Sequence, residues 1–126
     1  MRELLAVGLG GFVGAVARYV VSGWVHRFAG AGFPWGTLTV NLAGCLALGV
    51  VMGLVEARVA IAPAWRVFLG LGVLGSFTTF SSFGYETVEL IRGGESGLAL
   101  ANAAGSLVLG ALAVVAGAAL ARAIAG

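Results

Sequence analysis

Long stretches of apolar residues, separated by short segments rich in charged residues, glycine and proline, dominate the sequence. A transmembrane helix needs roughly 20 mainly apolar residues. Four stretches reach this length, and they run over Leu4–Val25, Thr37–Val55, Val67–Ile91 and Leu98–Ile124. Glycine and proline in the connections favour helix ends there. The pattern predicts an all-α integral membrane protein with four transmembrane helices, forming one domain over residues 1–126.

A polar segment from Gly75 to Phe83 interrupts the third apolar stretch. Six of its nine residues are glycine, serine or threonine, and these residue types are weak helix formers. Irregular backbone inside a membrane is tolerated only where it is buried in protein or lines a wet cavity, because unpaired backbone groups are costly in hydrocarbon. We therefore expect a break in the third helix, with an ion or solute path beside it.

The composition is typical of a membrane protein and argues against an enzyme and against a nucleic-acid-binding protein. The chain is 60% hydrophobic and 10% charged, with a mean hydropathy of +1.08, whereas a soluble domain is roughly 25% charged. It has no Asp, no Lys and a single His, so an enzyme is the least expected class. Its seven arginines are scattered, and nucleic-acid binding needs a clustered basic surface. We expect a multi-pass protein of the inner (plasma) membrane and no nucleic-acid partner.

The charges at the ends of the four stretches specify orientation only weakly. The side with both termini holds four arginines and the other side holds two, namely Arg2, Arg58, Arg66 and Arg122 against Arg27 and Arg92. The positive-inside rule gives this difference little weight, so the sequence is compatible with insertion in both orientations. The 22 glycines include Gly10-x-x-x-Gly14 and Gly49-x-x-x-Gly53, spacings that allow close helix packing. One four-helix chain has little room for a pore of its own, so we expect a homo-oligomer, and dimers are the commonest form.

Asn41 is the main candidate for chemistry in the second stretch. Its amide can donate to an anion or to a neighbouring helix, and the sequence leaves both roles open. Thr37 lies one turn earlier on the same face. Phe80 and Phe83 are three residues apart, and their ring edges carry partial positive charge that attracts a small anion without a formal cation. Core packing is the alternative role of this pair.

Other polar side chains follow the third and fourth stretches at helical spacing. One such stripe consists of Thr79, Ser82 and Glu86. We expect Glu86 to lie at a solvated helix end. Asn102 and Ser106, one turn apart, either face the same path or bond to neighbouring helices. Arg18 either reaches towards the interface or attracts anions to a vestibule.

Three segments together resemble the Fluc (CrcB) family of fluoride channels. They are Gly10–Tyr19 (GGFVGAVARY), Gly36–Gly44 (GTLTVNLAG) and Gly75–Phe83 (GSFTTFSSF). The resemblance covers three of the four stretches in the right order, with a similar total length. It implies an antiparallel, dual-topology homodimer with two fluoride pathways.

The resemblance also implies roles for individual residues. The pore asparagine of the family maps onto Asn41, and its pore phenylalanines map onto Phe80 and Phe83. A structural Na⁺ at the dimer interface would be held by backbone carbonyls that map onto Gly75 and Thr78 of both subunits. The fourth stretch keeps Ser106, whereas Asn102 stands where a tyrosine is often found and Gly110 where a second serine can occur. The expected anion pathway comprises Asn41, Phe80, Phe83, Ser106, Thr37, Thr79 and Ser82.

We therefore expect a passive channel that exports fluoride from the cytoplasm down its electrochemical gradient. The alternative is a small multidrug or guanidinium-type exporter, which also has four helices. Such exporters typically carry a glutamate within the first helix, and here that stretch contains Arg18 while Glu3 lies at the terminus. A third class is a scaffold subunit without transport activity. This class does not explain why Asn41, Phe80 and Phe83 accompany a break in the third helix.

Overall fold

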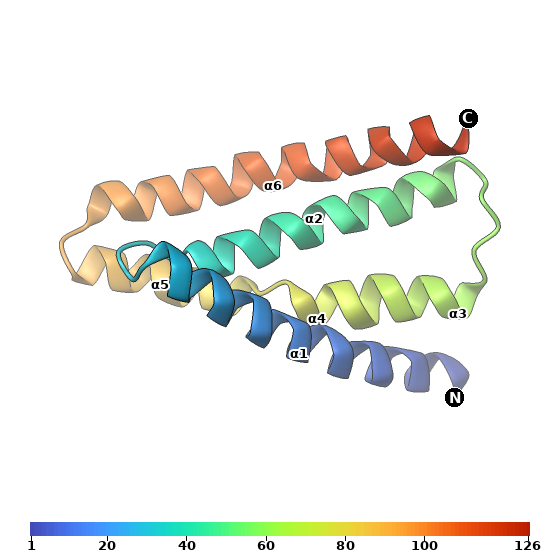
Figure 1. Cartoon of the computed structure of the whole chain (residues 1–126), viewed down its shortest axis with the longest axis horizontal. Helices are drawn as coiled ribbons and strands as arrows, with labels where there is room; N and C mark the ends of the chain where they lie inside the picture. Colours follow the sequence, from blue (N-terminus) through green and yellow to red (C-terminus); the bar gives the residue numbers. More distant parts are fainter.

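Four helical rods joined by short connections make up the structure, a computed structural model that describes all residues from 1 to 126. The first, second and fourth rods are the helices α1 (Arg2–Ala29), α2 (Trp35–Glu56) and α6 (Ser96–Ala125). The third rod consists of α3 (Pro63–Arg66), the π-helix η1 (Val67–Leu74), α4 (Gly75–Phe77) and α5 (Phe80–Arg92). Successive rods run in opposite directions, so both termini lie at the same end of the molecule (Figure 1).

Each rod is long and apolar enough to cross a membrane, and the spans are Arg2–Ala29, Trp35–Glu56, Pro63–Arg92 and Ser96–Ala125. The prediction of an all-α protein with four transmembrane helices is confirmed. Every rod is longer than its apolar stretch, because backbone hydrogen bonding continues past the last apolar residue into the polar ends. The sequence did not predict the π-helical form of η1, a geometry that is rare and often marks functional regions.

The second and fourth rods pack against each other through glycines. A Cβ added at Gly49 would collide with the carbonyl oxygen of Val114, and one added at Gly117 would collide with that of Leu46. Both glycines are buried. The backbones of α2 and α6 therefore approach more closely than any larger residue allows, which is the packing that small residues permit in membranes.

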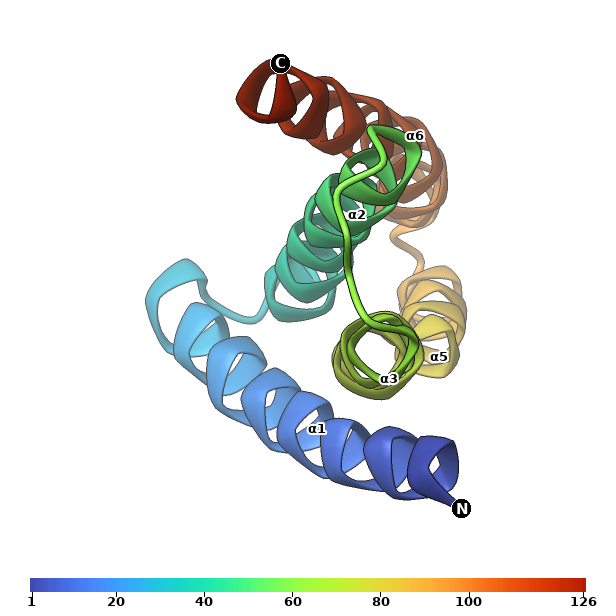
Figure 2. The same ribbon diagram turned by 90° about the vertical axis from the view of Figure 1, so that its right-hand side faces the viewer.

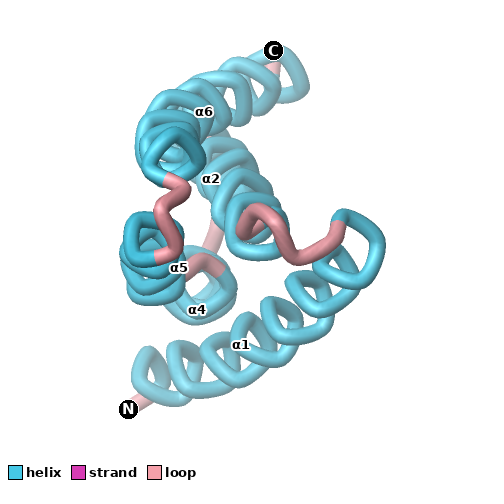
Figure 3. The backbone as a smooth tube through the Cα atoms, turned by 90° about the vertical axis from the view of Figure 1, so that its left-hand side faces the viewer, coloured by secondary structure: helices cyan, strands magenta, loops and turns pink.

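The first and third rods make a second contact of the same kind. A Cβ at Gly14 would collide with the carbonyl oxygen of Val73, and one at Gly10 would lie 2.9 Å from the Cα of Gly72. The close approach that the Gly10-x-x-x-Gly14 spacing predicts is confirmed. Views along the rods from the two ends show α2 beside α6 and α1 beside the third rod (Figures 2 and 3).

Large apolar side chains point outwards along all four rods. Phe12 is 71% exposed and Leu107 is 75% exposed, and only 15 of the 126 residues are buried. A helix that is apolar all round belongs in a membrane when it is not buried in protein. The two largest fully buried side chains are Val40 and Asn102, so a polar amide occupies one of the best-packed positions of the molecule.

Candidate functional site

Two residues with extended backbone, Thr78 and Thr79, separate α4 from α5 in the third rod. Their dihedral angles are φ −78°, ψ 158° and φ −149°, ψ 113°. Thr79 caps the start of α5, because its hydroxyl oxygen accepts a hydrogen bond from the Ser82 backbone N–H at 3.2 Å. Threonine at this position satisfies a donor that the first helical turn leaves unpaired. The polar residues of this segment therefore supply the local hydrogen bonds that regular helix does not provide.

Asn41 on α2 pairs with the backbone of Thr79. Its Nδ2 donates to the Thr79 carbonyl oxygen at 3.1 Å, and its Oδ1 accepts from the Thr79 N–H at 2.7 Å. The Thr79 N–H is thereby directed to a side chain rather than to the Gly75 carbonyl four residues earlier. One amide N–H of Asn41 remains for another partner, since a side-chain amide carries two donors.

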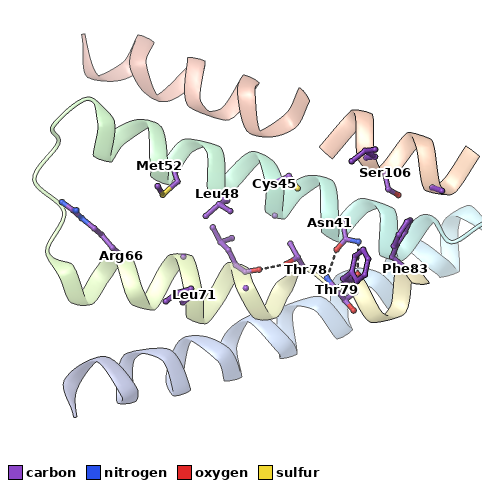
Figure 4. A pocket seen from close by; sticks show the side chains of 17 residues that line it. Asn41, Cys45, Leu48, Met52, Arg66, Leu71, Thr78, Thr79, Phe83 and Ser106 are labelled. Carbon is purple, nitrogen blue, oxygen red and sulfur yellow. Dashed lines mark hydrogen bonds between the residues drawn. The ribbon is translucent and has the colours of Figure 1, made fainter. Parts of the chain in front are cut away.

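A cavity of about 680 Å³, here called the central cavity, lies beside this pair (Figure 4). Phe80 and Phe83 line it from α5, with ring centroids 5.6 Å apart. Ser106 lines it from α6, and Asn41 lines it from α2. Arg66, at the far end, is the one charged residue in its lining, and its Nε donates to the Ile61 carbonyl at 3.0 Å. The wall near Asn41 thus offers an amide, hydroxyls and aromatic rings without a formal charge.

The expected pathway residues divide between this cavity and a second one. The central cavity collects Asn41, Phe80, Phe83, Ser106 and Thr79, together with Gly75 and Thr78. A polar cavity of about 660 Å³ collects Thr37, Ser82 and again Thr79. Thr79 therefore lies between the two cavities, and Thr37 and Ser82 are not brought into the central one. The part that each residue plays in conduction stays a prediction.

The polar cavity contains charged groups from α1 and α5. The Thr37 hydroxyl donates to Glu86 Oε1 at 2.7 Å, while Glu86 Oε2 is buried without a hydrogen-bond partner. Arg18 and His26 line the same cavity. The half-buried Arg18 forms no hydrogen bond or ion pair in the structure. The cavity thus contains an unpaired cation, Arg18, together with the carboxylate of Glu86.

The expectation that Glu86 lies at a solvated helix end is wrong. Its carboxylate is folded inwards against Thr37 of another rod, a contact that spacing along one helix does not indicate. Glu89, one turn later, is the solvated residue, because its side chain is 45% exposed and its carboxylate pairs with Arg92 at 2.9 Å.

Thr87 makes two polar contacts that we did not predict from the sequence. Its hydroxyl donates to the Phe83 carbonyl at 2.7 Å and accepts from Asn102 Nδ2 at 2.9 Å. The first of these bonds follows from spacing, since a threonine hydroxyl often bonds to the carbonyl four residues earlier. The second joins two different rods, and no local pattern predicts it.

The fold and the site together define a class, the polytopic helical membrane proteins whose polar side chains converge on cavities between their helices. Comparison with known proteins defines the family. The profile described as CrcB-like protein, Camphor Resistance (CrcB), matches residues 5–118. The chain belongs to the CrcB family.

Several relatives carry the name fluoride-specific ion channel FluC. The relative from Acidobacterium capsulatum is 41% identical over 112 residues, which cover 89% of this chain and 90% of the relative. The one from Thermus thermophilus is 48% identical over 112 residues, covering 89% and 87%. The one from Agrobacterium fabrum is 45% identical over 122 residues, covering 97% and 98%. The similarity therefore extends over nearly the whole of each protein.

Proposed function

We propose that the chain forms a fluoride-selective passive channel of the plasma membrane, which exports F⁻ from the cytoplasm down its electrochemical gradient. The observation that carries this proposal is the convergence of Asn41, Phe80, Phe83 and Ser106 on one cavity in a chain of the CrcB family. Relatives over nearly the full length are named fluoride-specific ion channels. They favour this function over a guanidinium-type exporter and over an enzyme.

The chemistry of the central cavity suits a small, strongly hydrated anion. An amide N–H of Asn41 and the Ser106 hydroxyl can donate to fluoride, and the edges of the Phe80 and Phe83 rings carry partial positive charge. Such weak, distributed donors replace hydration without trapping the ion, which conduction requires. A formal cation in the same wall would hold the anion more tightly. No phosphate-binding lysine exists to couple nucleotide hydrolysis to transport.

Two copies of the chain would complete the pathway in an antiparallel, dual-topology homodimer. Phe80 supports this part of the proposal, because it lines the central cavity and is 83% exposed in the single chain. A second subunit over this face would cover the ring. Chemical crosslinking in the membrane should give a dimer. A cysteine at the N-terminus should be labelled by an impermeant reagent in about half of the molecules from each side. Labelling from one side only would exclude dual topology.

A structural Na⁺ at the dimer interface would be held by the backbone carbonyls of Gly75 and Thr78. The donor set fits a hard cation, because Thr79 directs its N–H to Asn41 and so leaves the Gly75 carbonyl without that helical partner. Unwound carbonyls in membrane helices coordinate Na⁺. A bound ion stabilises the folded state by mass action, so the melting temperature should be higher in NaCl than in N-methylglucamine chloride. Equal values would remove the ion from the proposal.

Fluoride efflux from liposomes that contain the purified protein tests the function directly. We expect rapid fluoride efflux, little chloride efflux, and loss of flux in Phe80→Ile, which removes a ring edge. Equal fluoride and chloride flux would exclude selectivity. No flux of either ion would favour an exporter or a scaffold.

A further inference from the structure

A chain of hydrogen bonds connects two pathway residues through two residues outside the central cavity. It begins at Ser106, whose Oγ donates to Asn102 Oδ1 at 3.5 Å. Asn102 Nδ2 donates to Thr87 Oγ1 at 2.9 Å, and Thr87 Oγ1 donates to the Phe83 carbonyl at 2.7 Å. Neither Asn102 nor Thr87 lines the central cavity, whereas Phe83 and Ser106 do. Any effect of the two middle residues on an ion in that cavity therefore acts through the two outer ones.

The chemistry of the groups fixes the direction of every bond. A carbonyl oxygen can only accept, so the single proton of the Thr87 hydroxyl is committed to Phe83. An amide nitrogen can only donate, so Asn102 Nδ2 donates a hydrogen bond to Thr87 Oγ1. Asn102 Oδ1 then faces Ser106 as an acceptor. The two bonds at Thr87 are short, and the contact at Ser106 is at the long limit for a hydrogen bond.

The bond between Asn102 and Thr87 is the only side-chain hydrogen bond that joins α6 to α5. Asn102 is 2% exposed, and a buried amide in a membrane must find partners within the protein. The pair thus fixes how α6 is rotated and shifted relative to α5. Thr87 lies one turn after Phe83, and Asn102 lies one turn before Ser106, so the pair sets the relative position of these two cavity residues.

We infer that Asn102 and Thr87 form a clamp that positions Phe83 and Ser106 for fluoride passage. The short bonds hold the Phe83 backbone and the two helices in place. The long contact leaves the Ser106 hydroxyl free to turn its proton from Asn102 towards an arriving anion at little cost. Asn102 and Thr87 are positioning residues that do not touch the ion. The inference rests on the proposed function.

Thr87→Val tests the clamp, because valine keeps the shape of threonine and removes the hydroxyl. Thr87→Ser keeps the hydroxyl, and Asn102→Ala removes the other half of the clamp. Thr39→Val is the matched control, since Thr39 is half-buried like Thr87 and its hydroxyl forms no hydrogen bond in the structure. Liposome efflux gives two readouts. The fraction of fluoride released reports how many liposomes contain a working channel, and the rate constant reports the flux through each channel.

We expect Thr87→Val and Asn102→Ala each to lower the rate constant about threefold, the factor that corresponds to one average hydrogen bond between membrane helices. Thr87→Ser and Thr39→Val should keep the wild-type rate, and all four variants should keep the released fraction. A wild-type rate constant in both Thr87→Val and Asn102→Ala would overturn the clamp. So would a loss of the released fraction alone, because that result indicates a purely structural role. Wild-type protein without fluoride flux would instead overturn the proposed function.

Discussion

The side-chain amide of Asn41 and the backbone amide of Thr79 form a reciprocal pair, with an Nδ2–O distance of 3.1 Å and an Oδ1–N distance of 2.7 Å. Asn41 thus supplies from α2 the acceptor that the Thr79 N–H lacks between α4 and α5, and it adds a donor to the Thr79 carbonyl. Interhelical bonding and anion binding are not exclusive roles for this residue, because the pair uses only one of the two N–H groups of the side chain. One residue can therefore hold the interrupted rod in place and still offer a donor to fluoride.

Replacing Asn41 by leucine should destabilise the protein and abolish fluoride flux. The substitution leaves the Thr79 N–H without its Asn41 partner, and a buried unsatisfied backbone group costs about 1–3 kcal/mol. We expect a loss of about 1–3 kcal/mol in the free energy of unfolding, measured by denaturation in detergent. Thr39→Val on the same helix is the control and should change neither quantity. A leucine variant as stable as the wild type would show that the pairing of Asn41 with Thr79 does not stabilise the protein.

Thr79→Ala should weaken the start of α5, because the methyl group cannot accept the hydrogen bond from the Ser82 N–H. Loss of such a cap costs about 1 kcal/mol, so the melting temperature should fall. Thr79→Ser keeps the hydroxyl and should stay close to the wild type. If serine and alanine lower the melting temperature equally, then the hydroxyl is not what stabilises this helix start.

Gly117→Ala should separate α2 from α6. Its new methyl group would collide with the backbone carbonyl of Leu46, whereas a Cβ at Gly105 on the same helix meets nothing within 4 Å. Overpacking of this kind costs about 1–3 kcal/mol, while alanine in place of an open helical glycine is favourable by about 0.5–1 kcal/mol. Thermal melting should therefore show a lower midpoint for Gly117→Ala and an equal or higher one for Gly105→Ala. The reverse order would mean that the two rods do not pack through Gly117.

Arg18→Gln should lower fluoride flux most strongly at low ionic strength. Arg18 is the unpaired cation of the polar cavity, and attraction of an anion to a charged vestibule is screened by salt. Flux measured in low and high concentrations of an impermeant salt should differ more in the wild type than in the variant. Arg122→Gln is the control, because Arg122 lies on another helix and pairs with Glu56 at 3.5 Å. An identical salt dependence in the wild type and Arg18→Gln would exclude the role of Arg18 in attracting anions.

Much of the site was accessible from local sequence. The segment from Gly75 to Phe83 indicated where weak helix formers interrupt an apolar stretch, and Thr78 and Thr79 lie within it. The spacing of Phe80 and Phe83 indicated a shared face, and both rings line the central cavity. The partners of these residues were not accessible in the same way. Glu86 meets Thr37 across 49 residues of sequence, and helical spacing identifies neighbours only within about four residues.

The sequence by itself determined the four membrane-crossing helices, because stretches of roughly 20 apolar residues are long enough to cross a bilayer, and its motifs indicated the family. It also indicated close packing at Gly10, Gly14, Gly49 and Gly53, but not at Gly117. The tertiary structure alone decided which polar residues meet, including Asn41 with Thr79 and Asn102 with Thr87. These pairs depend on how far each helix is rotated and shifted against its neighbour. All the contacts between the packed helices, the polar pairs included, set that rotation and shift together, and no single stretch of sequence specifies them.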